Sequence, residues 1–175
     1  MTYPDNGIFF RKSDMILAAQ ADIGFLNKSR AHIRSGVHIS LSEKYPNPKY
    51  KGPVLTISLI IKSVMDSASE SEMAALYITA KKMMPIHNKI IEMGWLQAKS
   101  PIQTDKTTAV GLTNKTIVNK ATKSADMKLW WLRRRESQDQ FRYYWAPGSE
   151  HEGGYSTKNH PYNYNETKRA NPYLV

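Results

Sequence analysis

The stretch Ser67-Ala68-Ser69-Glu70-Ser71-Glu72-Met73-Ala74-Ala75-Leu76 marks the point where the hydrophobic pattern of the chain changes. Before it, residues 54–61 are rich in β-branched side chains, which favour a strand. After it, apolar residues recur with helical spacing at Met73, Leu76, Tyr77, Ala80, Met83 and Met84. Ser67 and Glu70 form a capping box, which predicts that a helix begins near Ala68. The stretch therefore separates a group of strands from a long helix.

The segments on either side complete an alternating order of strands and helices. We expect strands at 15–21, 36–41 and 54–61 before the long helix, and after it a strand at 102–104, a short helix ending near Leu112, a helix at 124–135 and a strand at Phe141–Trp145. Pro85 is expected to kink or interrupt the long helix, and Gly94 to end it. Three sequential strands predict an antiparallel meander, to whose edge the later strands add in parallel. The predicted fold class is α/β, with a five-stranded mixed sheet and helices packed on its faces.

Composition narrows the class of protein. The 175 residues include 25 Lys and Arg against 15 Asp and Glu, which gives a net charge of +10, and no cysteine. The length predicts one domain at residues 14–160, between a lead-in at 1–13 and a tail at 161–175. The lack of cysteine excludes disulfides, zinc thiolate sites and thiol catalysis. No signal peptide and no apolar run of about 20 residues is present, so we expect an intracellular protein of the cytoplasm or nucleus. The charge favours a polyanionic partner, most often nucleic acid.

Three carboxylates lie at the edges of the predicted elements. Asp22 follows the first strand, Glu72 lies about one turn into the long helix, and Asp105 follows the fourth strand. If these ends converge, the crowded carboxylates favour a bound divalent cation. Mg²⁺ prefers oxygen ligands, and two such ions about 4 Å apart can activate a water and stabilise the leaving oxygen of a phosphodiester. Considered alone, each acid has a simpler structural explanation. An Asp at the end of a strand commonly stabilises a turn, and a Glu near the start of a helix interacts favourably with the helix dipole.

Several motifs occur in one order along nearly the whole chain. They are Asp22, Ser67-Ala68-Ser69-Glu70-Ser71-Glu72, Gln103-Thr104-Asp105-Lys106-Thr107-Thr108-Ala109, Trp131-Leu132-Arg133, Phe141-Arg142-Tyr143-Tyr144-Trp145, Pro147-Gly148 and Tyr155-Ser156-Thr157-Lys158-Asn159-His160-Pro161. Each is weak alone, but in this order they resemble the ribonuclease H domain of copia-type LTR retrotransposon polyproteins. The resemblance implies a ribonuclease H-like fold and Mg²⁺-dependent endonucleolytic cleavage of the RNA strand of RNA–DNA hybrids, with two ions and with Mn²⁺ as a substitute. The implied partners are an RNA–DNA hybrid or other nucleic acid and a reverse transcriptase supplied by the same or another transposable element.

The same resemblance assigns the catalytic, metal-binding acids, which are Asp22, Glu72 and Asp105. The family's fourth acid corresponds to Gly154, which has no side chain to bind a metal, and Glu150 or Glu152 could replace it. Lys106 stands where the family has Asn, and its charge should weaken cation binding by repulsion. These departures support a second hypothesis, namely a catalytically impaired relic or a repurposed nucleic-acid-binding module.

A basic and aromatic segment is the candidate nucleic-acid surface. Its basic residues are Lys128, Arg133, Arg134, Arg135 and Arg142, and Lys115, Lys120 and Lys123 precede them. Basic side chains neutralise phosphates, and aromatic rings stack on bases or sugars. We expect Trp130 and Trp131 to lie mainly in the core and the arginines mainly on the surface. A hybrid duplex would be recognised through its backbone shape and 2′-hydroxyls.

Overall fold

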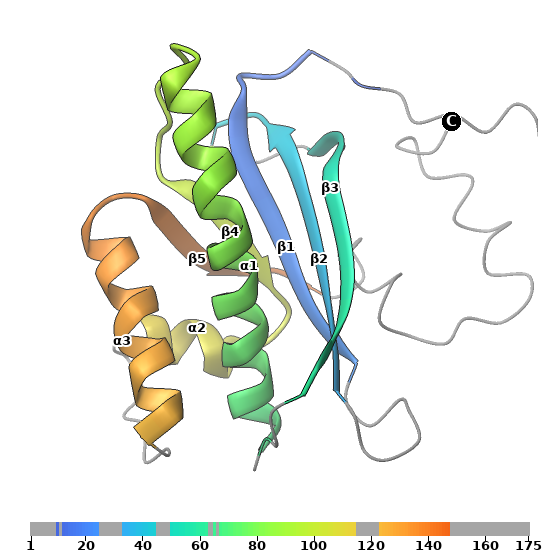
Figure 1. Cartoon of the computed structure of the whole chain (residues 1–175), viewed down its shortest axis with the longest axis vertical. Helices are drawn as coiled ribbons and strands as arrows, with labels where there is room; N and C mark the ends of the chain where they lie inside the picture. Colours follow the sequence, from blue (N-terminus) through green and yellow to red (C-terminus); the bar gives the residue numbers. More distant parts are fainter. Residues whose placement is uncertain are drawn as a thin grey trace, which may run out of the picture.

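The computed structural model describes residues 10, 12–24, 33–44, 50–62, 65, 67–114 and 123–147. Five strands and three helices follow one another in this part of the chain (Figure 1). In chain order they are β1 (Ile16–Gly24), β2 (Ile33–Ser42), β3 (Tyr50–Ile61), α1 (Ala68–Glu92), β4 (Ser100–Thr104), α2 (Thr107–Thr113), α3 (Lys123–Ser137) and β5 (Phe141–Trp145). No helix among these residues is long and apolar enough to cross a membrane.

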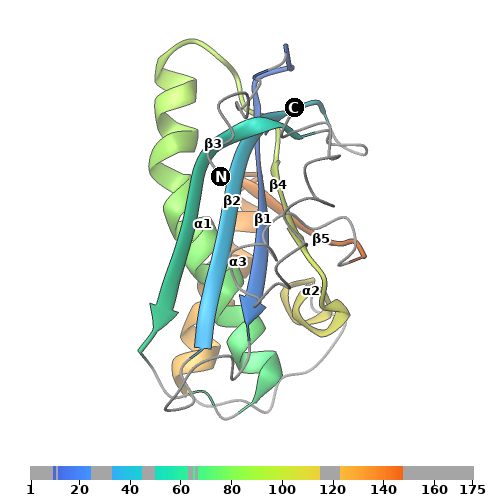
Figure 2. The ribbon, with the colours of Figure 1, turned by 90° about the vertical axis from the view of Figure 1, so that its right-hand side faces the viewer.

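The strands form a mixed sheet in the order β3-β2-β1-β4-β5 (Figure 2). β1, β2 and β3 pair antiparallel as a meander. β4 lies parallel to β1, and β5 lies parallel to β4. The predicted fold class is confirmed, including the addition of the later strands to the meander edge. Each parallel pair is joined through helices, as such a connection requires.

Several expected boundaries were wrong, among them the starts of β2 at Ile33 and of β4 at Ser100. The first strand does not end at Asp22, because Ile23 and Gly24 continue the pairing with β2. β3 begins at Tyr50, four residues before the expected start at residue 54. Pro85 does not interrupt α1, which runs unbroken to Glu92.

The expected start and end of α1 are confirmed. The Ser67 side chain accepts a hydrogen bond of 3.1 Å from the Glu70 amide, which satisfies an otherwise unpaired donor of the first turn. After Glu92 the backbone turns at Gly94, whose φ of +91° is readily adopted only by glycine. Both signals were readable in the sequence.

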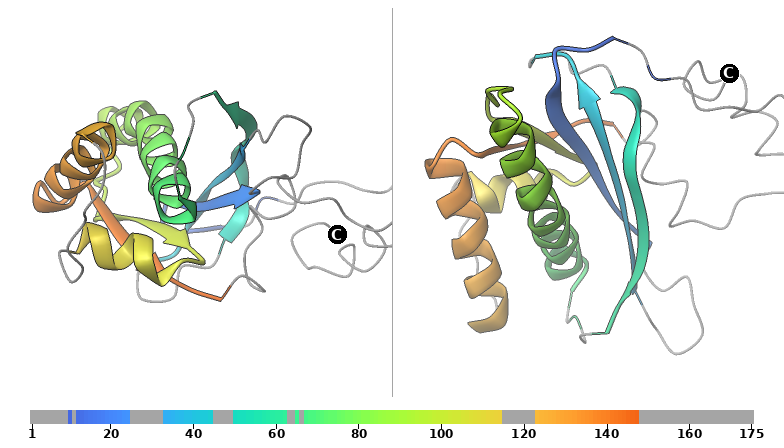
Figure 3. Two further views of the ribbon diagram at one scale, coloured as in Figure 1. Left: turned by 90° about the horizontal axis from the view of Figure 1, so that it is seen from below. Right: turned by 45° about the horizontal axis from the view of Figure 1, so that its top comes forward.

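The core lies between the sheet and the helices. Figure 3 shows α1 between α3 and strands β1, β2 and β3. Alternate strand residues point to opposite faces of a sheet, and the face toward the helices is apolar. Buried members of this core are Leu17, Ala19, Ala21, Val37, Ile39, Met73, Leu76, Ala80, Met83, Ile90, Ile102, Ala109, Leu112, Leu129, Leu132, Phe141 and Tyr143. The opposite face of β1 and β4 carries polar side chains, among them Gln20, Asp22 and Gln103, and these are the ones that bear on function.

Candidate functional site

The register of β1 and β4 places two of the predicted acids at equivalent positions. Gln20 of β1 pairs with Gln103 of β4, and the Gln20 Nε2 donates a hydrogen bond of 3.1 Å to the Gln103 Oε1. Asp22 and Asp105 each come two residues later on neighbouring parallel chains. Because side chains two residues apart share a face of a strand, both acids continue the same polar face. The register therefore places residues 22 and 105 at the same end of the β1–β4 pair.

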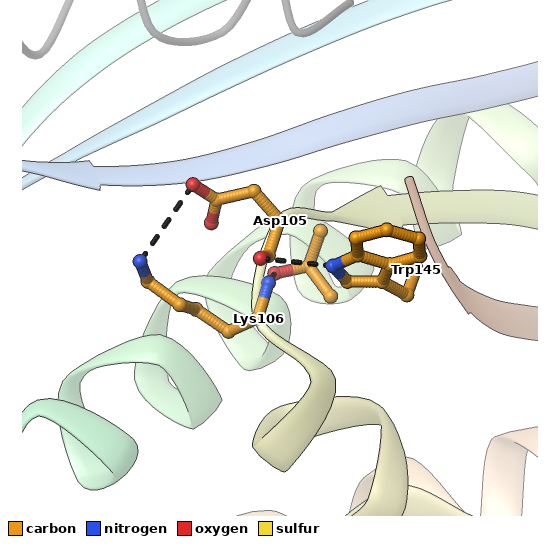
Figure 4. Close-up of polar contacts among 4 residues, drawn as sticks. Asp105, Lys106 and Trp145 are labelled. Carbon is orange, nitrogen blue, oxygen red and sulfur yellow. Dashed lines mark hydrogen bonds and ion pairs between the residues drawn. The ribbon is translucent and has the colours of Figure 1, made fainter. Parts of the chain in front are cut away.

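Asp105 lies in a crowded and mostly buried environment (Figure 4). Its side chain is 16% exposed, and Figure 4 shows the carboxylate turned toward β1. Its Oδ1 is buried and has no hydrogen-bond partner among the residues that the structure describes. The Nζ of Lys106 lies 3.8 Å from the Oδ2. The indole Nε1 of Trp145 donates a hydrogen bond of 3.1 Å to the backbone carbonyl oxygen of Asp105.

Glu72 approaches from a different direction. It is buried in the second turn of α1, which packs on the apolar face of the sheet. Ala21 and Ile23 lie on that face, so strand alternation directs the intervening Asp22 to the other face. No group of three Asp, Glu, His or Cys side chains is close enough to hold a metal ion in the described ranges.

The predicted basic residues differ in whether their side chains are exposed or bonded to other parts of the protein. Arg133 donates two hydrogen bonds to the backbone carbonyl oxygen of Leu112, at 3.1 Å from Nε and 2.6 Å from Nη2, and so ties α3 to the end of α2. Lys128 is half-buried, whereas Arg134 and Arg142 are exposed. Arg135 is half-buried and donates hydrogen bonds to two glutamine side chains of the following turn. The guanidinium groups of Arg133 and Arg135 are therefore both engaged in hydrogen bonds within the protein.

The tryptophan expectation is wrong for one of the two residues. Trp131 is half-buried and packs edge-on against Tyr77 of α1, with ring centroids 5.3 Å apart. Trp130 is 60% exposed and lies under the guanidinium of Arg134. α3 packs on the core through Leu129 and Leu132, which leaves the Trp130 side of the helix outside.

Solved structures share this fold. An RNase H1 isolated from compost by a metagenomic approach has a TM-score of 0.57 and 12% sequence identity, with 78% of this chain and 87% of that chain covered. The fold is ribonuclease H-like. The same compost RNase H1 in complex with an RNA/DNA hybrid has a TM-score of 0.56 and 12% identity, over 78% of this chain and 88% of that one. The N-terminal RNase H domain of a Mycobacterium tuberculosis protein has a TM-score of 0.50 and 13% identity, over 78% and 86%. No protein-family model and no curated protein matches the sequence.

The donor set of this ribonuclease H-like domain suits a hard divalent cation in part. Asp22 and Asp105 offer carboxylate oxygens, the ligands that Mg²⁺ prefers, and the Asp105 Oδ1 accepts no hydrogen bond from any described residue. Glu72 and the Lys106 ammonium complicate that fit, because Glu72 lies on the helix side of the sheet and the Lys106 Nζ lies 3.8 Å from the Asp105 Oδ2. The positions expected to complete the site, Gly154 with Glu150 and Glu152, lie outside the described residues, as do Lys115 and Lys120.

Sequence reasoning missed two features of the ribonuclease H-like domain. Trp145 was read as a strand residue, yet its indole contacts the backbone of Asp105. The aromatic–cation pairs of the helices were also missed, although Tyr77 with Lys81 and Trp130 with Arg134 share a spacing of four residues that brings side chains together on a helix. That spacing was the available signal, whereas nothing in the sequence indicated the contact of Trp145.

Proposed function

We propose that this ribonuclease H-like domain binds RNA–DNA hybrids and cleaves their RNA strand with the help of Mg²⁺. The observation that supports the proposal most is the equivalent placement of Asp22 and Asp105 at one end of the β1–β4 pair, with an Asp105 oxygen that has no hydrogen-bond partner within the described part of the chain. Two carboxylates at one level of adjacent strands repel each other, and a cation relieves that repulsion.

Each residue of the proposed site has a distinct role. Asp22 and Asp105 would hold the cation, and Glu72 is the third acid that the family resemblance assigns. When bound, Mg²⁺ would supply an activated water and neutralise charge on the scissile phosphate. Trp145 holds the backbone of Asp105 through its indole N–H, which limits the positions that the carboxylate can adopt. The exposed Arg134 and Arg142, with Lys128, would contact phosphates of the duplex, which is read by its shape.

The proposed origin is a copia-type LTR retrotransposon. The ordered motifs from Asp22 to Pro161 support it, and the described part of the chain from Asp22 to Pro147 has the expected sheet. In that setting a reverse transcriptase from the same or another element would generate the hybrid on which the domain acts.

A second candidate function is a nucleic-acid-binding module with impaired catalysis. The contact between Lys106 Nζ and Asp105 Oδ2 favours it, because an ammonium beside the carboxylate competes with a divalent cation. Gly154, where the family resemblance places a fourth acid, points the same way. The two candidate functions differ in whether the RNA strand is cleaved, and both use the same nucleic-acid-binding surface.

The test is cleavage of an end-labelled, blunt RNA–DNA hybrid in Mg²⁺ and in Mn²⁺. The native chain is compared with Asp105→Asn, Glu72→Gln and Gly154→Asp, and with Glu92→Gln as a control at the far end of α1. We expect cleavage by the native chain that is lost in Asp105→Asn and retained in Glu92→Gln. Hybrid binding, measured by fluorescence anisotropy, should be retained in all five proteins.

Each outcome supports or contradicts the two proposed functions in a different way. Cleavage that disappears in Asp105→Asn and Glu72→Gln supports a working nuclease in which three acids suffice. An inactive native chain with an active Gly154→Asp variant supports the binding module and identifies the missing ligand. Absence of hybrid binding by the folded native chain would contradict both functions.

A further inference from the structure

The outer face of α3 carries aromatic and basic side chains in alternation. Successive residues of an α-helix are 100° apart, so the side opposite Leu129 and Leu132 can be read directly from the sequence. In order around the helix, that side presents Trp130, Arg134, Met127, Trp131, Arg135 and Lys128. Met127 is 74% exposed and Trp130 is 60% exposed, which is unusual for side chains of this size and polarity.

Each tryptophan of this face is covered by the arginine four residues later. The guanidinium carbon of Arg134 lies 5.2 Å from the centroid of a Trp130 ring, and that of Arg135 lies 4.9 Å from Trp131. Both distances are within the range in which a cation is attracted to an aromatic face. The pairs hold the guanidinium groups over the indoles, and an Arg plane is itself a surface on which a base can stack.

The alternation continues onto α1. Trp131 packs edge-on against Tyr77 at 5.3 Å between centroids, and the Nζ of Lys81 lies 5.6 Å from the Tyr77 ring. We call these six residues the cation–aromatic ladder: one run of contacts across α1 and α3 joins Lys81, Tyr77, Trp131 and Arg135, and a separate pair on α3 joins Trp130 and Arg134. Its six members include three cations and no acid.

We propose that this cation–aromatic ladder binds single-stranded nucleic acid, with Trp130 as the stacking surface for an unpaired base. The bases of a duplex already stack on one another, so an exposed indole can receive only a base that is unpaired. Arg134 lies beside the Trp130 ring and can neutralise a phosphate next to that base, while Lys81 and Arg135 add positive charge around the neighbouring Tyr77 and Trp131 rings. The net charge of +10 adds long-range attraction for the same polyanion.

The ladder is separate from the acidic site. α3 leads into the start of β5, which pairs with the start of β4, whereas Asp105 follows the end of β4. A five-residue strand is roughly 17 Å long, so Arg134 and Arg135 lie toward the end of the sheet away from Asp105. This proposal rests on the proposed function only for the class of partner, which is nucleic acid. In that setting the ladder would bind an unpaired strand that extends from the hybrid.

The experiment measures binding of fluorescein-labelled oligo(dT) by anisotropy at two salt concentrations, with the full chain and no divalent cation. Trp130→Ala is compared with Trp95→Ala, because Trp95 is 51% exposed and makes no cation–π contact in the described part of the chain. Arg134→Gln is compared with Lys82→Gln, an exposed lysine beside Lys81. Circular dichroism verifies that each variant is folded.

We expect Trp130→Ala to weaken oligo(dT) binding at least fivefold, because one stacked base contributes roughly 1–3 kcal/mol, and Trp95→Ala to change it less than about twofold. Arg134→Gln should reduce the slope of log affinity against log salt by about 0.7, the value for one phosphate contact on a single strand. Native affinity that matches Trp130→Ala, or a native chain that prefers polyglutamate or anionic vesicles to oligo(dT), would overturn the proposal. Asp105→Asn separates this result from the nuclease hypothesis, since it should abolish cleavage and leave oligo(dT) binding unchanged.

Discussion

Replacing Lys106 with Gln should increase the affinity of the protein for divalent cations. The Lys106 Nζ lies 3.8 Å from the Asp105 Oδ2, so its charge faces any cation bound by that carboxylate. The substitution removes the charge and retains a side chain of similar length. The direction of the effect follows from Coulomb repulsion alone and does not require that the chain be an active nuclease.

The magnitude follows from the exposure of the two side chains. Charges of +2 and +1 held about 4 Å apart repel by about 2 kcal/mol in water. The Lys106 side chain is 53% exposed and can rotate into solvent, so only part of that energy opposes metal binding. We expect about 1 kcal/mol, which corresponds to a roughly fivefold lower dissociation constant. The difference should shrink as salt is added, because the Debye length falls to about 3 Å at 1 M salt.

The assay is titration with Mn²⁺, with the free ion detected by electron paramagnetic resonance. Lys82→Gln is the matched control, because Lys82 is exposed on α1 ten residues, or about 15 Å, beyond Glu72. Equal affinities of the native chain and Lys106→Gln would refute the reasoning. If Lys106→Gln and Lys82→Gln increase the Mn²⁺ affinity equally, the effect comes from net charge, and the reasoning is refuted as well.

Three further substitutions test other contacts. Burial lowers the pKa of His87, so protonation favours the unfolded chain. The stability contributed by the neutral ring is complete above about pH 6.5, the unfolded-state pKa, and is lost as pH falls below it. Urea unfolding at pH 7.5 and 5.5 should therefore show a smaller acid loss in His87→Gln. Trp145→Phe removes the hydrogen bond to the Asp105 carbonyl, and should cost about 1 kcal/mol of unfolding free energy and weaken Mn²⁺ binding. Arg133→Lys keeps the charge but loses the paired hydrogen bonds to Leu112, so thermal unfolding should show about 1 kcal/mol lower stability while hybrid affinity stays within about twofold.

Each of the three has an outcome that would contradict it. Equal acid losses in the native chain and His87→Gln would show that other groups determine the pH dependence. Unchanged Mn²⁺ affinity in Trp145→Phe would mean that the indole stabilises the fold and does not position Asp105. A large loss of hybrid affinity in Arg133→Lys would place that guanidinium on the nucleic acid and not on α2.

The sheet was predictable because its signals are local. β-branched runs, the Ser67 capping box and Gly94 each act within a few residues, and strand order follows from the short meander and the helical crossovers. The errors at the strand boundaries have one cause. Pairing with a neighbouring strand extends β1 past Asp22 and β3 back to Tyr50, and such pairing is not visible in the chain segment itself.

The candidate site was only partly predictable, for a related reason. Strand alternation fixes the face of Asp22 and helix position fixes that of Glu72, but their relation depends on how α1 packs across the sheet. The contact of Trp145 with Asp105 depends likewise on the parallel pairing of β4 with β5. Sequence patterns indicate which face of its own element a residue occupies, whereas tertiary packing decides which faces meet.

The acidic site and the cation–aromatic ladder are positioned by independent means. The register of β1 with β4 positions Asp22 and Asp105, while the four-residue spacing along α3 places the Arg134 guanidinium over the Trp130 ring. We therefore expect a substitution beside Asp105 to affect the proposed metal site without disturbing the ladder. For this reason a nuclease of this fold could lose turnover and still bind nucleic acid, so the two proposed functions require the same surface and differ only at the acidic end of the sheet.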